Sequence, residues 1–317
     1  MKLDEIHDLL VNSARGRVAR DVRLAPMTTY KLGGPASVLF EPHDVDDLAL
    51  LAEVLTKVDA SGDVPVFALG RGSNVVISDH GWKGVAVRMS DAWSRIDGKG
   101  DAACVAGAAT SLPVMANWAA RRGLSGVEFG IAIPGSVGGA VRMNAGAHGG
   151  QMSDHLAYVR IFDLRASDVV EVAAAGLGLS YRHSNLVDHQ IVLEAELLLQ
   201  PDDAGAIRAR MEEYRRHRAA TQPGANQNAG STFKNPPGDS AGRLVEAAGL
   251  KGFRVGAAHV SELHANFFIA PEGASAQDVF DLVEEVGARV AEVTGVKLEP
   301  EVRFLGEFAT HAVGGPA

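Results

Sequence analysis

Glycine is concentrated in clusters along this chain, and the largest cluster constrains the fold more than any other sequence feature. Seven glycines fall between residues 130 and 150, which is more than a structural turn usually needs. A shorter cluster, with glycines at 70 and 72, lies between two apolar runs. Because glycine lacks a Cβ, the backbone N–H groups of such loops can approach a ligand closely and converge on phosphate oxygens. Taken alone, the shorter cluster is equally compatible with an ordinary tight turn.

The two loops do not match the Rossmann fingerprint. That fingerprint places Gly-x-Gly-x-x-Gly after a strand and at the start of a helix, with an acidic residue about 20 positions later. The segment 133–140 reads Ile-Pro-Gly-Ser-Val-Gly-Gly-Ala and lacks this spacing. In the shorter loop, Ser73 and Asn74 follow the glycines and can add donors or caps, as a pyrophosphate cradle requires. Two separated glycine loops therefore favour a flavin site outside the Rossmann class.

Length and composition indicate a soluble chain of several domains. At 317 residues the chain exceeds the usual single-domain size, so we expect two or three packed units with room for a sizeable ligand between them. Charged residues make up 22% and hydrophobic residues 46%, and no apolar run approaches the roughly 20 residues of a membrane span. The net charge of −9 argues against a general affinity for nucleic acid, whose phosphate backbone requires a basic surface.

The start of the sequence and its cysteine content suit the cytoplasm. Residues 1–8 lack the basic-then-apolar plan of a secretory signal. Cys104 is the only cysteine, so no disulfide can form within the chain, and a reducing compartment is favoured. His259 and His264 have no cysteine or acidic residue at metal-site spacing, so we expect no metal ion.

Hydrophobic periodicity predicts an α/β chain. Helices are expected over 44–57, from Pro113 to a close at Gly123, from Ala204, and from Ser275 with Asp278 as a capping box. Strands are expected at 64–69, 74–78, 84–89, 103–106, 158–162, 169–172, 191–198 and 298–305. The change to a helical pattern after residue 203 indicates a domain boundary there.

Short motifs follow one another in a specific order over roughly residues 23–307. In the first half they are Thr-Thr-Tyr-Lys-Leu-Gly-Gly-Pro-Ala (28–36), Leu-Gly-Arg-Gly-Ser-Asn (69–74), the segment 133–140, and Met-Asn-Ala-Gly (143–146). In the second half they are Tyr-Arg-His-Ser (181–184), Ala-Gly-Ser-Thr-Phe-Lys-Asn-Pro (229–236), Ala-Gly-Arg-Leu-Val-Glu (241–246), His-Ala-Asn-Phe (264–267) and Leu-Glu-Pro-Glu-Val (298–302). In this combination the chain closely resembles the UDP-N-acetylenolpyruvoylglucosamine reductases.

The resemblance implies both a fold and a reaction. The fold has two α/β subdomains of the vanillyl-alcohol-oxidase (PCMH) type, which hold FAD non-covalently, and a third α/β domain that covers the substrate. We therefore expect FAD-binding subdomains at 1–95 and 96–203, a substrate-binding domain at 204–309 and a flexible tail at 310–317. The implied reaction is the NADPH-dependent reduction of UDP-N-acetylglucosamine enolpyruvate to UDP-N-acetylmuramate in peptidoglycan precursor synthesis, by a cytoplasmic monomer that binds neither nucleic acid nor a membrane.

The cofactor-binding residues implied by the resemblance fall on the glycine loops and their neighbours. They are Gly70, Arg71, Gly72, Ser73, Asn74, Gly107, Ile133, Pro134, Gly135, Ser136, Gly138, Gly139, Asn144, Ala145 and Gly146.

Three residues are implied to be catalytic. The reaction adds a hydride to one carbon of an enol ether and a proton to its neighbour, so it needs one proton donor and one electrophilic cluster. Ser231 falls at the family's proton-donating serine, Arg182 at its enolate-polarising arginine, and Glu301 at its second glutamate. From the residues alone, Ser231 reads as a turn serine, Arg182 as a surface ion-pair residue and Glu301 as part of a solvated strand face shared with Glu299.

Substrate contacts are expected from Lys234, Asn235, His264 and Asn266, with Arg215, Arg216 and Arg218 as a weaker source of positive charge for a diphosphate. The sequence also departs from the family pattern. Thr221 stands where a lysine is usual, and Arg142 and His148 replace common tyrosines. Only 48 residues separate Arg182 from Ser231, which resembles the subclass without an inserted tyrosine loop.

Two other functions remain open from the sequence. An alcohol or sugar oxidase of the same flavin fold would not need the set Ser231, Arg182 and Glu301. A catalytically silent flavin- or nucleotide-binding protein would keep the glycine loops but lose the proton donor or its electrophilic partners.

Overall fold

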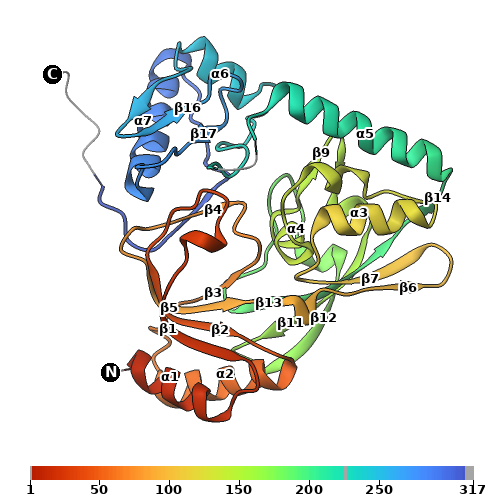
Figure 1. Cartoon of the computed structure of the whole chain (residues 1–317), viewed down its shortest axis with the longest axis vertical. Coiled ribbons are helices and arrows are strands. Elements are labelled where there is room, and N and C mark those ends of the chain that lie inside the picture. Colours follow the sequence, from red (N-terminus) through yellow and green to blue (C-terminus); the bar gives the residue numbers. More distant parts are fainter. Residues whose placement is uncertain (1, 225–226, 311–317) are drawn as a thin grey trace. The chain divides into compact units, whose positions relative to one another are not determined.

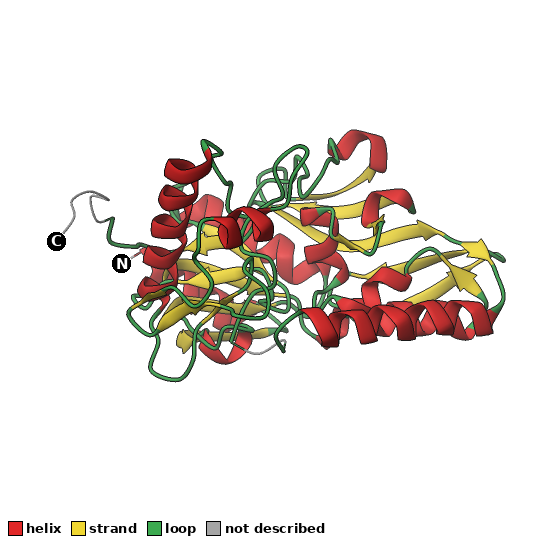
Figure 2. Ribbon diagram, turned by 90° about the horizontal axis from the view of Figure 1, so that it is seen from above, coloured by secondary structure: helices red, strands yellow, loops and turns green. Residues whose placement is uncertain are grey.

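The computed structural model describes residues 2–224 and 227–310 (Figure 1). The chain forms two compact units, and neither is continuous in sequence. Unit 1 comprises residues 1–22, 36–71 and 83–218, and unit 2 comprises 23–35, 72–82 and 219–317. Both units contain helices and strands, which confirms the α/β class. Figure 2 shows the helices and strands of the chain.

The two units do not test the expected domain boundaries near residues 95 and 203, which stay predictions. Two early segments, 23–35 and 72–82, group with the C-terminal unit, while residues 204–218 group with unit 1. Residues 204–218 group with unit 1 because they belong to the helix α5 (Ala204–Thr221). Ile207 and Met211 of this helix pack against Ala116 and Ala120 of unit 1. A finer division of unit 1 into two FAD-binding subdomains stays a prediction. The expected tail lies outside the described residues from residue 311 onward.

One layer of unit 1 is a four-stranded sheet covered by two helices. The helices α1 (Lys2–Ser13) and α2 (Val45–Val58) lie on one face of it in Figure 1. Ile6 and Leu10 of α1 and Leu48 and Leu51 of α2 are fully buried there. In spatial order the strands are β1 (Arg17–Arg23), β2 (Pro35–Glu41), β5 (Trp82–Arg88) and β3 (Val66–Leu69).

The side chain of Asp44 caps the start of α2. Asp44 accepts a hydrogen bond from Asp47 N at 3.2 Å, which satisfies a backbone donor of the first turn. Asp47 is only 2% exposed, and its carboxylate accepts from the N–H groups of Arg15, Gly16 and His43 at 2.8–2.9 Å. This buried carboxylate therefore joins the start of α2 to the segment before β1 and to the segment after β2.

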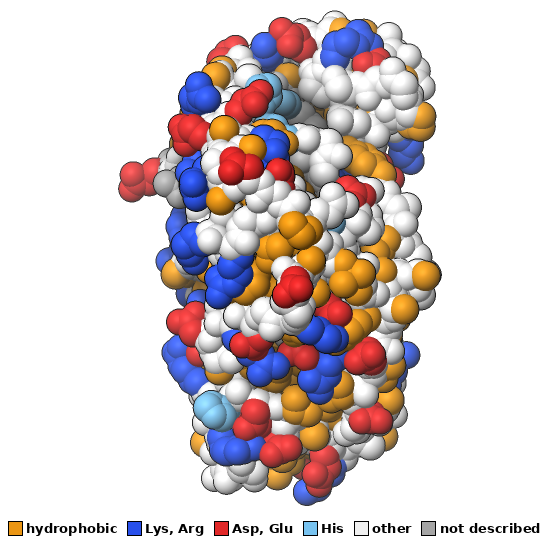
Figure 3. All heavy atoms as spheres, turned by 90° about the vertical axis from the view of Figure 1, so that its right-hand side faces the viewer, with side chains coloured by type: hydrophobic (Ala, Val, Ile, Leu, Met, Phe, Trp, Pro, Cys, Tyr) orange, Lys and Arg blue, Asp and Glu red, His pale blue; other side chains and the backbone are white. Residues whose placement is uncertain are grey.

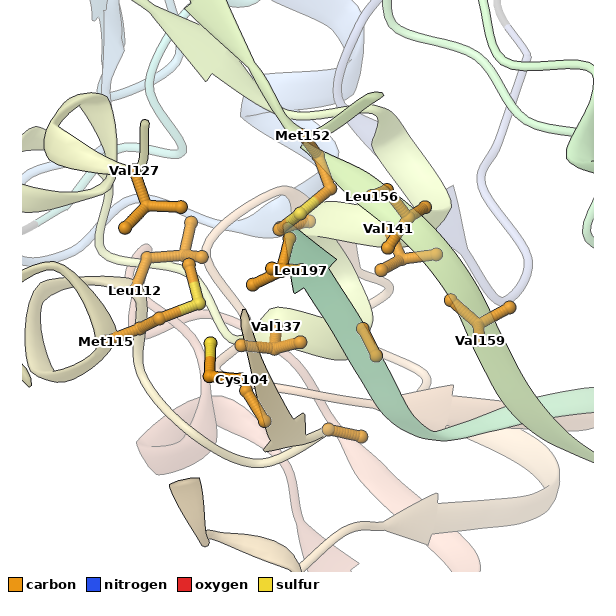
Figure 4. Close-up of a cluster of buried hydrophobic side chains, with 14 of the residues drawn as sticks. Cys104, Leu112, Met115, Val127, Val137, Val141, Met152, Leu156, Val159 and Leu197 are labelled. Carbon is orange, nitrogen blue, oxygen red and sulfur yellow. The ribbon is translucent and has the colours of Figure 1, made fainter. Parts of the chain in front are cut away.

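The other layer of unit 1 is a five-stranded antiparallel sheet. Its helices are α3 (Leu112–Arg121) and α4 (Val137–Met143), and the core between them and the sheet contains Cys104, Met115 and Val137 (Figure 4). Cys104 is fully buried in this core, and its burial raises the pKa of the thiol to about 11. In spatial order the strands are β12 (Asp168–Ala173), β11 (Leu156–Asp163), β13 (Gln190–Leu198), β7 (Ala103–Gly107) and β6 (Ile96–Lys99).

The strands expected at 103–106, 158–162, 169–172 and 191–198 are thereby confirmed, as is the helix that ends before Gly123. Two short antiparallel pairs complete the strands of unit 1. They are β8 (Leu124–Ser125) with β14 (Gln200–Pro201), and β9 (Gly146–Ala147) with β10 (Gly150–Gln151).

Unit 2 is built around the long helix α7 (Ala276–Thr294). Ser275 and Asp278 form the expected capping box, and Gly295 closes the helix in a left-handed conformation with φ 72°. The Asp79 carboxylate also accepts from the N–H groups of Ala276 and Gln277, at 3.0 and 3.1 Å. Around α7 lie the helix α6 (Ala241–Ala247), the strands β15 (Arg254–Val255), β16 (Ala258–Val260) and β17 (Phe268–Ile269), and the parallel pair β4 (Val75–Ile77) and β18 (Arg303–Leu305).

The strand expected over 298–305 is wrong in its first half. Only Arg303–Leu305 is a strand, and before it Pro300 makes a single isolated bridge to Phe233. Proline lacks the N–H group that a continuous ladder needs. Strict strand alternation therefore does not place Glu299 and Glu301 on one face.

Candidate active site

Ser231 lies in unit 2 in a segment whose backbone is held on several sides. Gly230 before it has φ 77°, a conformation that suits glycine, and its N–H donates to Asn228 Oδ1 at 3.0 Å. Ser231 itself is half-buried and forms an isolated bridge with Phe267. The serine hydroxyl is thus carried by a fixed backbone that leaves it partly open to a ligand.

The structure brings Ser231 close to Glu301 in the same unit. The carbonyl of Thr232 accepts from the N–H of Glu301 at 2.8 Å and from that of Val302 at 3.4 Å. Glu301 is half-buried, and its own carbonyl accepts from Asn74 Nδ2 at 3.0 Å. The expected proton donor, the expected glutamate and one residue of the shorter glycine loop therefore lie on adjoining segments.

Lys234 and Glu299 form an ion pair two residues further along these segments. Their side chains meet at 2.5 Å between Nζ and Oε1, while Lys234 N donates to Glu299 O at 2.9 Å. The Lys234 side chain is 20% exposed. The structure therefore distinguishes the two glutamates, because Glu299 pairs with the lysine and Glu301 lies beside Thr232.

The other expected substrate contacts have structural partners. Asn235 Oδ1 accepts from Ala241 N at 3.0 Å and so caps α6 together with Ser240. His264 Nδ1 accepts from Asn266 N at 3.2 Å, and burial lowers the pKa of the His264 imidazole. Asn266 is 3% exposed. These residues lie near Ser231 in the fold, but their hydrogen bonds first serve the protein itself.

The shorter glycine loop presents free backbone donors at its unit 2 end. Gly72 has φ 62°, and a Cβ on it would lie 2.2 Å from Met27 O, so only glycine fits. Within residues 2–224 and 227–310, the N–H groups of Gly72, Ser73 and Asn74 have no acceptor. Three successive backbone donors with no protein partner fit a diphosphate group.

The longer glycine loop, in unit 1, has a similar arrangement. Ser136 caps α4, and the N–H groups of Gly135 and Ser136 have no protein acceptor in the described part of the chain. Gly138 N donates to Ala108 O at 2.9 Å, and a Cβ on Gly138 would come 3.0 Å from the Ala108 Cβ. Gly107 is required for packing, since a Cβ there would lie 2.1 Å from Trp93 O. The loop thus combines close packing behind it with open donors at Gly135 and Ser136.

Arg182 is joined to the end of this glycine-rich region within unit 1. Its guanidinium donates to Gly146 O at 2.6 Å and to Asn144 O at 3.4 Å, and it lies 5.0 Å from the ring centre of Tyr181. Arg182 has φ 53°, an uncommon conformation for a residue with a side chain. Asn144 is 1% exposed, and its carboxamide accepts from Ser153 N at 2.9 Å. The structure brings Arg182, Asn144 and Gly146 together.

The two departures from the family's tyrosines also have defined partners. Arg142 pairs with Asp188 at 2.5 Å. His148 stacks on Tyr214 of α5, with ring centres 4.2 Å apart, and His217 approaches edge-on at 5.4 Å. Burial and the neighbouring His217 and Arg218 lower the pKa of the His148 imidazole.

The three arginines expected at the end of α5 have different surroundings. Arg215 lies 3.7 Å from Glu212, Arg216 donates to the helix carbonyl of Glu212, and Arg218 donates to Ala132 O beside the longer glycine loop. Burial lowers the pKa of Arg218. Only Arg218 therefore lies against an expected cofactor loop, a placement that helical periodicity alone did not reveal.

Other site types find no support in the described part of the chain. No cluster of three or more His, Cys, Asp or Glu side chains in residues 2–224 and 227–310 could hold a metal ion. No helix among these residues is long and apolar enough to cross a membrane. On the face drawn in Figure 3, Lys and Arg side chains are interspersed with Asp and Glu.

Comparisons with known proteins identify the family of the chain. Residues 222–305 match the family model of the UDP-N-acetylenolpyruvoylglucosamine reductase C-terminal domain, and residues 36–173 match an FAD binding domain. A UDP-N-acetylenolpyruvoylglucosamine reductase of Acidiphilium cryptum is 44% identical over 292 residues, which cover 92% of each chain. One of Rubrobacter xylanophilus is 45% identical over 90% of this chain and 95% of its own length. The crystal structure of the Thermus caldophilus reductase superposes with a TM-score of 0.78 at 38% identity, over 92% of this chain and all of that one. Together with the order of the motifs around Ser231 and the glycine loops, these matches show that the chain belongs to the UDP-N-acetylenolpyruvoylglucosamine reductase family.

Proposed function

We infer that this chain uses FAD and NADPH to reduce UDP-N-acetylglucosamine enolpyruvate to UDP-N-acetylmuramate, and that Ser231, Arg182 and Glu301 are its catalytic residues. The observation that carries the residue assignment is the pairing of Thr232 O with the N–H groups of Glu301 and Val302, at 2.8 and 3.4 Å. This pairing sets Ser231 and Glu301 on adjoining segments of one unit. A hydroxyl donor beside a carboxylate suits proton delivery to a carbon next to a developing negative charge.

The chain's own residues divide the chemistry between them. Ser231 Oγ–H donates a proton to one carbon of the enol ether, and Glu301 supports that transfer from the neighbouring segment. The Arg182 guanidinium is always protonated and stabilises the substrate carboxylate and the enolate charge. FAD, when bound and reduced by NADPH, supplies the hydride for the other carbon.

The cofactor is held through backbone donors on both glycine loops. In unit 2 the N–H groups of Gly72, Ser73 and Asn74, and in unit 1 those of Gly135 and Ser136, have no protein acceptor among the described residues, and each set suits phosphate oxygens. Gly107 and Gly138 allow close packing next to the longer loop, because a Cβ at either position would meet Trp93 O or Ala108. In this proposal Asn144 positions the loop through its buried carboxamide.

Lys234 is the residue we assign to the substrate's diphosphate. The Lys234 side chain is partly exposed, and its ammonium group already binds the carboxylate of Glu299. The same ammonium donors can bind the anionic oxygens of a ligand. Asn235 and His264 shape the same wall through α6 and the 264–267 turn. The chain is proposed to act as a cytoplasmic monomer without nucleic-acid or membrane partners. Size-exclusion chromatography with light scattering tests whether it is a monomer.

Separate measurement of the two half-reactions tests the proposal. Purified Ser231→Ala should accept electrons from NADPH as the wild type does, but its reduced flavin should no longer be reoxidised by the enolpyruvyl substrate, because only that step needs the proton. Ser240→Ala, which removes a helix cap in the same unit, is the matched control and should leave both rates near wild type. Equal slowing of both half-reactions in Ser231→Ala would show that Ser231 is structural. A wild-type protein that oxidises sugars, and does not reduce the enolpyruvyl substrate, would favour the oxidase alternative.

A further inference from the structure

Asn266 has an unusual set of contacts for a residue expected to touch the substrate. Its side chain is buried, with the residue only 3% exposed. The carboxamide Oδ1 accepts from Phe233 N at 2.9 Å, and Nδ2 donates to Phe233 O at 2.8 Å. The side chain therefore pairs with both backbone groups of one residue, as a neighbouring strand would.

The backbone of Asn266 continues the same pairing. Its carbonyl accepts from Thr232 N at 2.8 Å, and its N–H donates to His264 Nδ1 at 3.2 Å. The next residue, Phe267, forms the bridge with Ser231. The turn 264–267 thus contacts three successive residues that begin with the proposed proton donor.

The opposite side of this segment is held by the residues around Glu301. Thr232 O accepts from Glu301 N and Val302 N, while Phe233 forms a bridge with Pro300. The segment 231–233 therefore lies between the 264–267 turn and the 300–302 segment. The carboxamide of Asn266 hydrogen-bonds to this segment through a side chain, so a substitution can remove these bonds and leave the backbone bonds of the turn in place.

We propose that Asn266 is a positioning residue, which holds the segment 231–233 against the Glu301 segment and so fixes the Ser231 hydroxyl for proton transfer. The inference rests on the proposed roles of Ser231 and Glu301, and it replaces direct substrate contact as the function of Asn266. The carboxamide is buried, and its oxygen and nitrogen each already pair with the backbone of Phe233, so its position suits a structural role better than direct contact with the substrate.

The expected size follows from what the substitution leaves behind. Asn266→Ala leaves the N–H and C=O of Phe233, a residue only 1% exposed, without their side-chain partners. The segment is then free to shift, and a misplacement of about 1 Å in a reacting group costs about 10²-fold in rate. We expect a loss of this size in the step that uses the Ser231 proton.

The experiment measures both half-reactions of the FAD-loaded enzyme by stopped flow. Asn266→Ala should reduce its flavin with NADPH at the wild-type rate, should be reoxidised by the enolpyruvyl substrate about 10²-fold more slowly, and should bind that substrate with a Kd within about threefold of wild type. The solvent deuterium isotope effect on reoxidation should rise, because proton transfer becomes more rate-limiting. Asn266→Asp keeps the bond to Phe233 N but loses the donor to Phe233 O, so its loss should be intermediate.

Two controls keep the interpretation specific. Val290→Ala truncates a fully buried side chain of α7 in the same unit and should lower Tm without slowing reoxidation selectively. If Asn266→Ala behaves like Val290→Ala, or if it raises Kd for the substrate while reoxidation at saturation stays at the wild-type rate, the positioning role is wrong. A wild-type reduced enzyme that the enolpyruvyl substrate does not reoxidise would instead contradict the proposed function.

Discussion

Replacement of Glu299 by glutamine should strengthen the binding of the diphosphate substrate. The Glu299 carboxylate lies 2.5 Å from Lys234 Nζ, and the backbone bond from Lys234 N to Glu299 O, at 2.9 Å, keeps the two residues opposite each other. Because Lys234 is proposed to bind the diphosphate, the ligand's anionic oxygens have to compete with Glu299 for the same ammonium donors. Removal of the competing charge should therefore favour the ligand.

The exposure of the pair sets the size of the effect. The side chain of Lys234 is 20% exposed and that of Glu299 is 69% exposed, so water screens the ion pair. Ion pairs at protein surfaces contribute about 0.2–1 kcal/mol. Since 1.4 kcal/mol corresponds to a factor of ten, Glu299→Gln should lower the substrate Kd by about 1.4- to 5-fold. The rate at saturating substrate should stay within about twofold of wild type, because Glu299 has no assigned part in proton transfer.

Titration of the oxidised enzyme with substrate, followed by flavin absorbance, measures this Kd. Glu246→Gln is the matched control, since it removes the carboxylate of the Lys251 pair, at 2.8 Å, on another part of the same unit. Its Kd should equal that of the wild type. Lys234→Ala should weaken binding, and Glu299→Gln added to Lys234→Ala should give no gain, because the effect acts through the lysine.

Glu301→Gln provides the contrast that can refute the reasoning. It should spare flavin reduction by NADPH and slow substrate reduction by roughly 10²- to 10⁴-fold. If Glu299→Gln abolished turnover while Glu301→Gln remained near wild type, the assignment of the two glutamates would be reversed. An unchanged or higher Kd in Glu299→Gln would show that Lys234 does not bind the diphosphate.

Three further predictions concern the cofactor and the stability of the fold. The flavin should be FAD that acid or heat releases, because Cys104 is the only cysteine and is buried; colour that stays with the precipitated chain would contradict this. Burial lowers the pKa of the His264 imidazole in the folded chain. The neutral imidazole therefore contributes its full stability above the unfolded-state pKa of about 6.5, and this stability is lost as the pH falls through the folded-state pKa. Tm should decline over this pH range, and less steeply in His264→Gln. Gly72→Ala should lose FAD at equilibrium dialysis, because the new Cβ would lie 2.2 Å from Met27 O.

The sequence predicted the elements with strong periodicity or caps. The capping box of Ser275 and Asp278 and the β-branched runs of the five-stranded sheet depend on local chemistry, and the structure confirms them. The prediction of a strand over 298–305 was wrong in its first half. It relied on the alternation of apolar residues, whereas Pro300 lacks the N–H group that a continuous ladder needs. Local signals were therefore reliable wherever neighbouring residues alone determine the conformation.

Contacts between distant segments could not be read from the sequence. The grouping of residues 72–82 with the C-terminal unit depends on β4 pairing with β18, whose residues are more than 200 positions away. The ion pair of Lys234 with Glu299 depends on the same kind of long-range pairing. Both motifs were identified, but the distinction between Glu299 and Glu301 required the register of the two segments.

The carboxamides of Asn144 and Asn266 show why polar residues in binding motifs are hard to assign from sequence. Both belong to motifs expected to touch a ligand, yet both are buried, at 1% and 3% exposure, and both pair with backbone groups of the protein. A loop that must offer its own N–H groups to a diphosphate, or hold a serine hydroxyl free, cannot use regular secondary structure to fix its backbone. An asparagine side chain carries the same donor and acceptor as a peptide group, so it can replace the missing neighbouring strand. In both motifs, an asparagine that looks like a ligand contact can therefore be required because it holds the backbone that makes the contact.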